Sequence, residues 1–132
     1  MKKWISLLFV FLLCSCSLKK EPKIYIFYSQ TCPSCEVLKT SFIPQIPNSI
    51  KVELLDIDEN ELFYNEVLNR LENIDKSLYS QPMTPFIYFE SKFAAVGYEK
   101  IMDEIYLQLI DESLNNQEYS IVPSGVWVEK GE

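Results

Sequence analysis

Apolar and polar residues alternate along residues 23–29 and again along residues 50–57, and such alternation is typical of a half-buried β-strand. Between these two runs, apolar side chains recur three and four positions apart, which predicts a helix over residues 33–43. Two prolines then end that helix, because a proline has no N–H for the helical ladder. The residues of the apolar helix face are Cys35, Leu38 and Phe42, and the prolines are Pro44 and Pro47.

The following residues predict a second helix, a hairpin and a last helix. The helical periodicity covers residues 61–72 and 101–114, and residues 73–84 between the second helix and the hairpin are predicted to be a loop. Two short apolar runs within residues 86–96 predict the β-hairpin. The positions expected to be buried are Leu62, Phe63, Val67, Leu68 and Leu71 in the second helix, and Ile101, Met102, Ile105, Tyr106, Leu109 and Ile110 in the last.

This order of elements predicts an α/β fold. Strands that are linked through helices run parallel, and the closing hairpin adds an antiparallel edge. We therefore expect a mixed β-sheet with parallel core strands, a C-terminal β-hairpin and flanking helices. Residues 117–132 remain outside this pattern, and their apolar runs 121–123 and 126–128 are candidates for a further short hairpin.

The N-terminal residues have the pattern of a secretory leader. Two lysines precede an apolar stretch over residues 4–13, and a helix that spans a bilayer needs roughly twenty such residues. The leader ends in Leu13-Cys14-Ser15-Cys16, which resembles the bacterial lipobox. The resemblance implies that Cys16 becomes the first mature residue and carries lipid on its sulfur, which would tether the protein to the outer side of a membrane. Cleavage as an ordinary signal peptide, which leaves Cys16 free, is the alternative.

These patterns divide the chain into four parts. We expect a signal peptide in residues 1–15, a lipid anchor and tether in 16–22, one globular domain in 23–116, and a C-terminal extension in 117–132. Removal of the leader leaves roughly 117 residues, which is enough for one core. The expected mature protein is a monomer in the cell envelope, anchored to the lipid bilayer through Cys16.

The composition excludes several classes of function. The net charge of −7 argues against nucleic acid as a partner. The chain has no histidine, which excludes Ser-His-Asp and Cys-His catalysis and histidine-ligated zinc. Its three glycines form no phosphate-binding pattern, so the sequence gives no support for a nucleotide. We expect no cofactor.

The motif Cys32-Pro33-Ser34-Cys35 stands directly after the first predicted strand. With Cys32 as the N-cap and Pro33 at the first helical position, the Cys32 sulfur faces the N–H groups of Ser34 and Cys35. These donors and the positive helix end stabilise a thiolate, which lowers its pKa from about 8.5 toward roughly 3.5–7.5 in such motifs. Cys35 lies one turn inward, close enough to form a disulfide. Cys32 is therefore the expected nucleophile, and Cys35 resolves the mixed disulfide.

Two motifs in this order of elements resemble those of the thioredoxin superfamily over residues 23–115. One is the CxxC at the start of the first helix, and the other is Thr84-Pro85 just before the third predicted strand. The resemblance implies a thioredoxin-like fold in which Thr84-Pro85 is cis, lies against the two sulfurs and pairs with an extended substrate segment. It further implies a thiol–disulfide oxidoreductase that acts on protein cysteines. Secreted thioredoxin-like accessory proteins of bacteriocin export systems are similar in size and motif.

The chain departs from thioredoxin itself in the region of this motif. It lacks the extra strand and helix before the core, and its Cys-Pro-Ser-Cys is closer to the glutaredoxin-type motif. Thioredoxins carry a buried Asp six residues before the first cysteine, where this chain has Ile26. Glu36 is a candidate proton acceptor in its place, and a solvated glutamate in the first helical turn is the alternative.

The direction of electron flow is not encoded by the motif alone, because about 30 mV corresponds to roughly 1.4 kcal/mol for this couple. By resemblance, a threonine before the proline favours a reductase or isomerase slightly. Either direction requires an electron donor or acceptor at the membrane. Three alternatives stay open: a structural disulfide without turnover, a Cu(I) carrier with Met83 as an extra ligand, and a module that binds an extended client at Thr84-Pro85.

Overall fold

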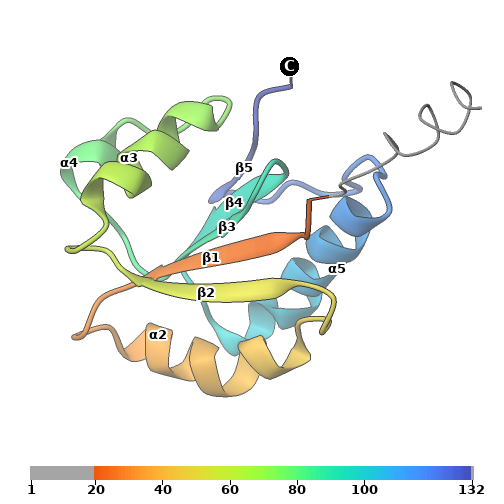
Figure 1. The fold of residues 1–132 in the computed structure, drawn as a ribbon, viewed down its shortest axis with the longest axis horizontal. Helices are drawn as coiled ribbons and strands as arrows, with labels where there is room; N and C mark the ends of the chain where they lie inside the picture. The colour runs from red at the N-terminus through yellow and green to blue at the C-terminus, as the bar shows by residue number, and fades with distance from the viewer. Residues whose placement is uncertain (1–19, 132) are drawn as a thin grey trace, which may run out of the picture.

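The computed structural model describes residues 20–131, which form one α/β domain with a five-stranded mixed sheet (Figure 1). The strand order is β2-β1-β3-β4-β5. The strands are β1 (Lys23–Tyr28), β2 (Lys51–Asp56), β3 (Phe86–Phe89), β4 (Phe93–Val96) and β5 (Val126–Val128). The α-helices are α2 (Pro33–Val37), α3 (Glu61–Arg70), α4 (Ser77–Ser80) and α5 (Asp103–Leu114), with shorter turns η1 (Leu38–Phe42), η2 (Ile43–Gln45) and η3 (Lys100–Met102).

The sheet confirms the predicted mixture of parallel and antiparallel strands. β1 and β2 run parallel, while β1–β3, β3–β4 and β4–β5 are antiparallel pairs. The parallel part is thus a single pair. In the register, Tyr28 lies opposite Asp56 and Phe27 lies opposite Phe86. The last residues of β1 and β2 and the first residue of β3 therefore lie side by side at the same end of the sheet.

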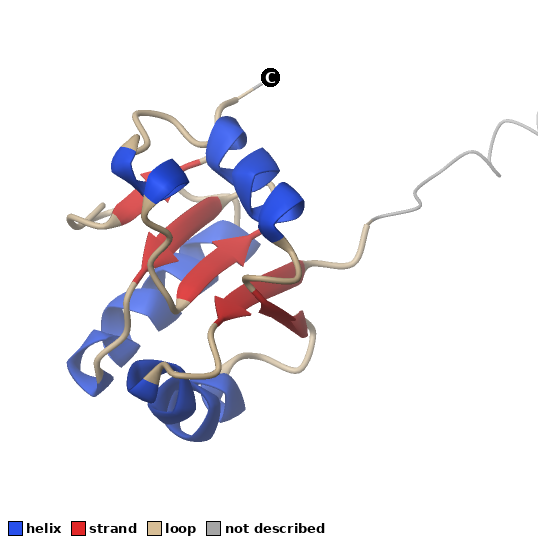
Figure 2. Ribbon diagram, turned by 90° about the vertical axis from the view of Figure 1, so that its left-hand side faces the viewer, coloured by secondary structure: helices blue, strands red, loops and turns tan. Residues whose placement is uncertain are grey.

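Helices cover the sheet on both sides (Figures 1 and 2). One buried cluster joins the sheet to the side that carries α2 and α5, and it contains Ile24, Ile26 and Phe42. The other joins the sheet to α3 and α4 and contains Phe27 and Tyr64. Successive residues of a strand point to opposite faces, so the alternation in β1 supplies both clusters.

The helix predicted over residues 33–43 exists, but it changes its winding and continues to Gln45. After α2, the N–H of Ile43 bonds to the carbonyl of Leu38, five residues back, which is a π-type turn. Pro44 follows in the short 3₁₀ turn η2. Because Pro44 cannot donate to the ladder and its ring crowds the preceding turn, a regular α-helix cannot pass through it.

The predicted buried face of α3 is partly wrong. Leu62, expected in the core, is 88% exposed, whereas Tyr64 is completely buried together with Val67 and Leu68. Residues 64, 67, 68 and 71 form their own stripe with helical spacing. Burial of Tyr64 is compatible with its polar end because its hydroxyl donates a hydrogen bond to the Leu78 carbonyl over 3.2 Å.

The last helix also buries fewer of the predicted positions. Tyr106, Leu109 and Ile110 are in the core, but Ile101 is 82% exposed and Ile105 is exposed as well. Ile101 belongs to η3, a 3₁₀ turn, so the spacing of four that relates it to Ile105 does not place the two residues on one α-helical face.

Two predictions about connecting segments are corrected by the structure. Residues 73–84, predicted as a loop, contain the short helix α4, and the Ser77 N–H at its start bonds to the Asp75 carboxylate over 2.9 Å. Residues 121–123 do not form a hairpin with 126–128, because β5 pairs with β4 instead.

The C-terminal segment therefore completes the sheet. At the end of β5, the Val128 carbonyl accepts a hydrogen bond from the Glu72 N–H over 2.9 Å, and beyond β5 the Lys130 N–H donates to the Arg70 carbonyl over 2.9 Å. Leu71 and Glu129 form an isolated antiparallel bridge between these two segments. Residues 117–132, predicted to be an extension outside the domain, thus include a strand that bonds to β4 and to the end of α3.

The predicted leader and Cys16 lie outside the described residues. Within residues 20–131, no helix is long and apolar enough to cross a bilayer.

Candidate functional site

Cys32 and Cys35 form a disulfide at the start of α2, with their Cα atoms 5.3 Å apart. Cys32 is the N-cap, with extended backbone angles, and Pro33 occupies the beginning of the helix. The Cys35 N–H donates to the Cys32 Sγ over 3.2 Å. Of the two N–H donors predicted for this sulfur, Cys35 is the one that bonds to it in the described part of the chain.

The two sulfurs differ in their access to solvent. Cys35 is buried, with 1% of its surface exposed, while Cys32 is half-buried and Pro33 is exposed. A reagent that approaches from solvent therefore meets Cys32 first. This asymmetry fits an attacking sulfur at position 32 and a shielded resolving sulfur at position 35.

The Thr84-Pro85 segment, just before β3, lies at the same end of the sheet as the disulfide, which follows β1. The peptide bond between the two residues is cis, as the sequence resemblance implies. The Thr84 hydroxyl donates to the Ser29 hydroxyl over 3.4 Å, and the Ser29 carbonyl accepts a hydrogen bond from the Cys32 N–H over 3.3 Å. Ser29 thus links the segment before β3 to the loop that carries Cys32. Ser29 belongs to no motif of the sequence, and its role in this link depends on the tertiary contact with Thr84.

Glu36, the candidate proton acceptor, faces solvent. Its carboxylate pairs with Lys39 over 3.2 Å, and the Lys39 ammonium lies 4.3 Å from the centre of the Tyr28 ring. Glu36 thus points to solvent, away from the buried Cys35, which favours the alternative of a solvated glutamate in the first helical turn.

Asp56 is a buried carboxylate near this site that the sequence analysis missed. It is the last residue of β2, is only 9% exposed, and lies opposite Tyr28 in the register. Because Ile26 packs in the cluster on the α2 side, Tyr28 and its partner Asp56 face that side too. The Gln30 amide donates to the Asp56 carboxylate over 3.4 Å. The second predicted strand has Val52 and Leu54 on one face. The same alternation puts Asp56 on that face, so the sequence pattern alone could have indicated that Asp56 faces α2.

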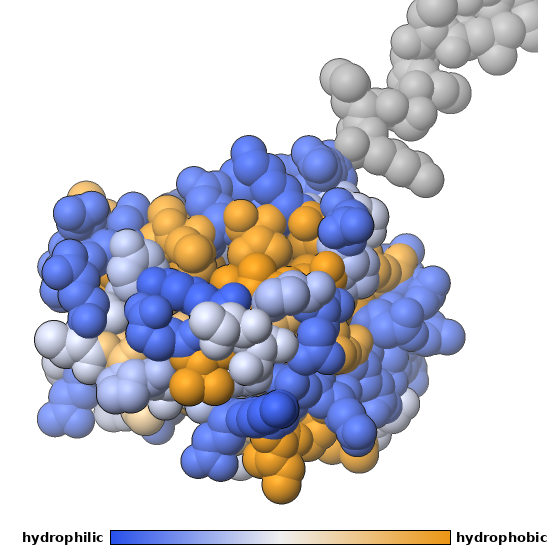
Figure 3. All heavy atoms as spheres, turned by 90° about the horizontal axis from the view of Figure 1, so that it is seen from below, coloured by the Kyte–Doolittle hydropathy of each residue, from blue (hydrophilic) through white to orange (hydrophobic). Residues whose placement is uncertain are grey.

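Exposed apolar side chains occur next to the disulfide and next to the cis-proline in the chain. Val37 follows Cys35 by two positions, Met83 precedes Thr84, and both side chains are exposed. Figure 3 looks onto the side that carries α2 and shows hydrophobic areas separated by hydrophilic residues.

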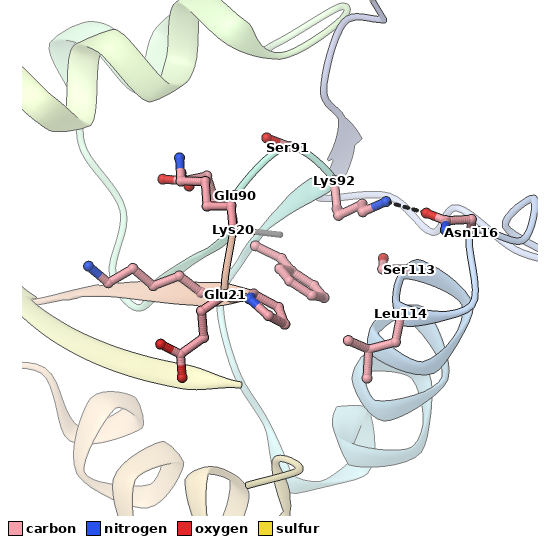
Figure 4. Close-up of a pocket in the computed structure, with 11 residues that line it drawn as sticks. Lys20, Glu21, Glu90, Ser91, Lys92, Ser113, Leu114 and Asn116 are labelled. Carbon is pink, nitrogen blue, oxygen red and sulfur yellow. Dashed lines mark hydrogen bonds and ion pairs between the residues drawn. The ribbon is translucent and has the colours of Figure 1, made fainter. Parts of the chain in front are cut away.

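A hollow of about 420 Å³ lies at the opposite end of the sheet from the disulfide (Figure 4). The start of β1, the β3–β4 turn and the end of α5 line it. Each of its three lysines is already engaged. Lys20 pairs with Glu90, Lys23 pairs with Glu53 over 2.9 Å, and Lys92 donates to Asn116 over 2.8 Å. The hollow therefore does not combine with the cysteines into one site.

No group of three or more Cys, Asp and Glu side chains within residues 20–131 is arranged to hold a metal ion. Met83, the extra ligand considered for Cu(I), is exposed at the position before Thr84. The candidate site therefore consists of the Cys32–Cys35 disulfide and the Thr84-Pro85 segment, which Ser29 links.

Comparisons of the chain with protein-family models, with curated proteins and with solved structures find no match.

Proposed function

We propose that the protein is a thiol–disulfide oxidoreductase of thioredoxin-like fold, which exchanges electrons with cysteine-containing proteins through Cys32 and Cys35. The observation that carries the proposal is that Cys32, the partly exposed N-cap residue, accepts the Cys35 N–H on its sulfur while Cys35 itself is buried. A disulfide that only staples the fold gains little from a loop of this size, because the stabilisation grows with loop length.

The topology supports the fold assignment. A parallel β1–β2 pair connected through a helix is followed by a helix and an antiparallel β3–β4 hairpin, and helices cover both faces. The CxxC stands between β1 and α2, and the cis Thr84-Pro85 bond stands just before β3. These are the positions that the resemblance to the thioredoxin superfamily implies.

The chemistry is a two-step exchange. In the reducing direction, the Cys32 thiolate attacks one sulfur of a substrate disulfide, and the other substrate sulfur leaves as a thiolate that takes up a proton. The Cys35 thiolate, formed by loss of its proton, then attacks the Cys32 sulfur of the mixed disulfide. This second attack releases the remaining substrate sulfur as a thiol. The substrate gains two electrons, and the protein ends in the Cys32–Cys35 disulfide seen in the structure.

The substrate class is protein cysteines in an extended segment. Such a segment would lie along Thr84-Pro85, next to Cys32, with Met83 and Val37 as apolar contacts. The slight preference for a reductase or isomerase over an oxidant rests on Thr84. Turnover in either direction needs a membrane partner that donates or accepts two electrons.

A lipid anchor at Cys16 would place the disulfide on the side of the domain away from the membrane. The chain is fixed to the sheet from Pro22 onward, because the Pro22 carbonyl accepts the Lys51 N–H over 3.0 Å. β1 then runs from this point toward Cys32, at the other end of the sheet (Figure 1). The six residues of β1 alone span about 20 Å. The electron partner would therefore need a domain that extends into the aqueous phase.

The test is a redox titration of the protein against glutathione and dithiothreitol, with Cys32→Ser as the control. We expect reversible exchange in the parent protein and none in the variant. A reduction potential near −270 mV would assign a reductant, and one near −120 mV would assign an oxidant. If the disulfide exchanges with neither reagent, it is a structural staple and the proposed function is wrong.

A further inference from the structure

The segment from Leu78 to Pro85, which leads from α4 into β3, is held from the α3 side by a buried tyrosine. The Tyr64 hydroxyl donates to the Leu78 carbonyl over 3.2 Å, and Tyr64 is completely buried. Burial raises the pKa of Tyr64 to about 12, so the hydroxyl keeps its proton and stays a donor at neutral pH. The Tyr64 hydroxyl therefore fixes the beginning of this segment, at Leu78.

The other end of the segment is held from the α5 side. The Pro85 carbonyl accepts the Gly97 N–H over 2.8 Å, and the Gly97 carbonyl accepts the Tyr106 hydroxyl over 2.7 Å. Gly97 has a φ of 83°, a backbone conformation that side chains other than glycine rarely adopt. Tyr106 is only 4% exposed and packs with its ring against Phe42 and Tyr98.

The two tyrosines reach the segment from opposite layers of the domain. α3 and α5 lie on different sides of the sheet, and the segment leads from α4, on the α3 side, to the beginning of the central strand β3 (Figure 1). The segment in turn contacts the disulfide loop through Thr84 and Ser29. A shift of Gly97 or Leu78 would therefore change the position of Thr84-Pro85 relative to Cys32.

We propose that Tyr64 and Tyr106 are positioning residues that fix the Thr84-Pro85 segment for a polypeptide substrate. The inference rests on the proposed function and assigns a further property to the same site. A small thiol needs contact with Cys32 alone, whereas a polypeptide must also fit against the segment. The two hydroxyls thus control the binding of protein disulfides and leave the exchange with small thiols unchanged.

The experiment compares Tyr106→Phe with Tyr119→Phe. Both substitutions remove one buried or half-buried hydroxyl, but the Tyr119 hydroxyl bonds to Ser113 Oγ over 2.8 Å, at the end of α5 beside the hollow and away from the disulfide. The substrates are a disulfide-bonded peptide and dithiothreitol. We expect Tyr106→Phe to raise KM for the peptide by about fivefold, which is the usual effect of one lost hydrogen bond. kcat and the rate with dithiothreitol should stay at the parent values.

Tyr64→Phe gives a second, independent test from the other side of the sheet, and the melting temperature of each variant shows whether it folds. The proposal is overturned if both folded variants keep the parent KM, or if Tyr119→Phe raises KM equally. A parent protein that exchanges with neither substrate would instead refute the proposed function, and the inference with it. An effect on KM without an effect on small-thiol exchange distinguishes positioning from general loss of structure.

Discussion

The backbone N–H of Cys35 points at the Sγ of Cys32 and donates a hydrogen bond to it over 3.2 Å. The bond follows from the N-cap position of Cys32, and the same N–H also donates to the Cys32 carbonyl over 3.2 Å. In the reduced protein, the same donor would meet a thiolate. The helix end is thus arranged to stabilise negative charge on one cysteine of the pair.

Selective alkylation of the reduced protein should show this asymmetry. We expect iodoacetamide to modify Cys32 about tenfold or more faster than Cys35 at pH 7, because Cys32 is partly exposed and its sulfur accepts the Cys35 N–H, while Cys35 is buried. Mass spectrometry of a time course measures the two rates. Equal rates at the two cysteines would contradict the assigned roles.

The two carboxylates near the site should differ in their importance. Asp56 is a buried carboxylate on the α2 side of the sheet, and as a general base it would take the proton of Cys35. We therefore expect Asp56→Asn to slow the step in which Cys35 resolves a mixed disulfide by at least about tenfold. Glu36→Gln removes an exposed partner of Lys39 and should leave that step unchanged. Stopped-flow measurements with a preformed mixed disulfide, from pH 5 to pH 9, compare the variants. The reverse order of effects would restore Glu36 as the proton acceptor.

Acid stability should depend on Glu112. Hydrogen bonds from the Ser120 hydroxyl and the Gln108 amide lower the pKa of Glu112 below its ordinary value of 4.5, against an opposing effect of burial. A carboxyl whose pKa is lower in the folded state stabilises the fold above its unfolded pKa, and this contribution disappears as pH falls through the folded pKa. Glu112→Gln should therefore lower the melting temperature at pH 7 and have a smaller effect at pH 3.

The control for this prediction is Glu104→Gln, a substitution of an exposed glutamate on the same helix. Melting curves at both pH values suffice. An equal loss at pH 3 and pH 7 in Glu112→Gln would mean that the charge of Glu112 is not responsible for the effect.

Two leucines of α3 offer a matched test of the core. Leu68→Ala should reduce the free energy of unfolding by about 2–5 kcal/mol, because Leu68 is fully buried between α3 and the sheet. The same change at Leu62, which is exposed, should stay within about 0.5 kcal/mol. Urea unfolding measures both. Similar losses at the two positions would show that Leu62 has a partner that this structure does not contain.

The sequence was sufficient for the features that depend on local pattern. The alternation in β1, the N-cap position of Cys32 and the helical spacing after it all depend on neighbouring residues, and the structure confirms them. The Cys32–Cys35 pairing also follows from local spacing. Features of this kind need no knowledge of the rest of the fold.

Other features depend on tertiary contacts and could not be predicted. Tyr64 is buried and Leu62 is exposed, and the acceptor of the buried Tyr64 hydroxyl is the Leu78 carbonyl, fourteen positions away. Asp56 lies near the site because β2 pairs with β1 in one register. β5 pairs with β4, thirty residues earlier in the chain, and not with the apolar run next to it. In each case the deciding partner lies outside the local window.

The position of β5 also has a consequence for folding during synthesis. Until residues 126–128 arrive, the outer N–H and C=O groups of β4 have no strand beside them, and an open strand edge readily pairs with other chains. During synthesis, which proceeds from the N-terminus, there would thus be a stage in which Phe93–Val96 is an open edge strand that can pair with other chains. This edge is covered only when β5 has been made and pairs with it.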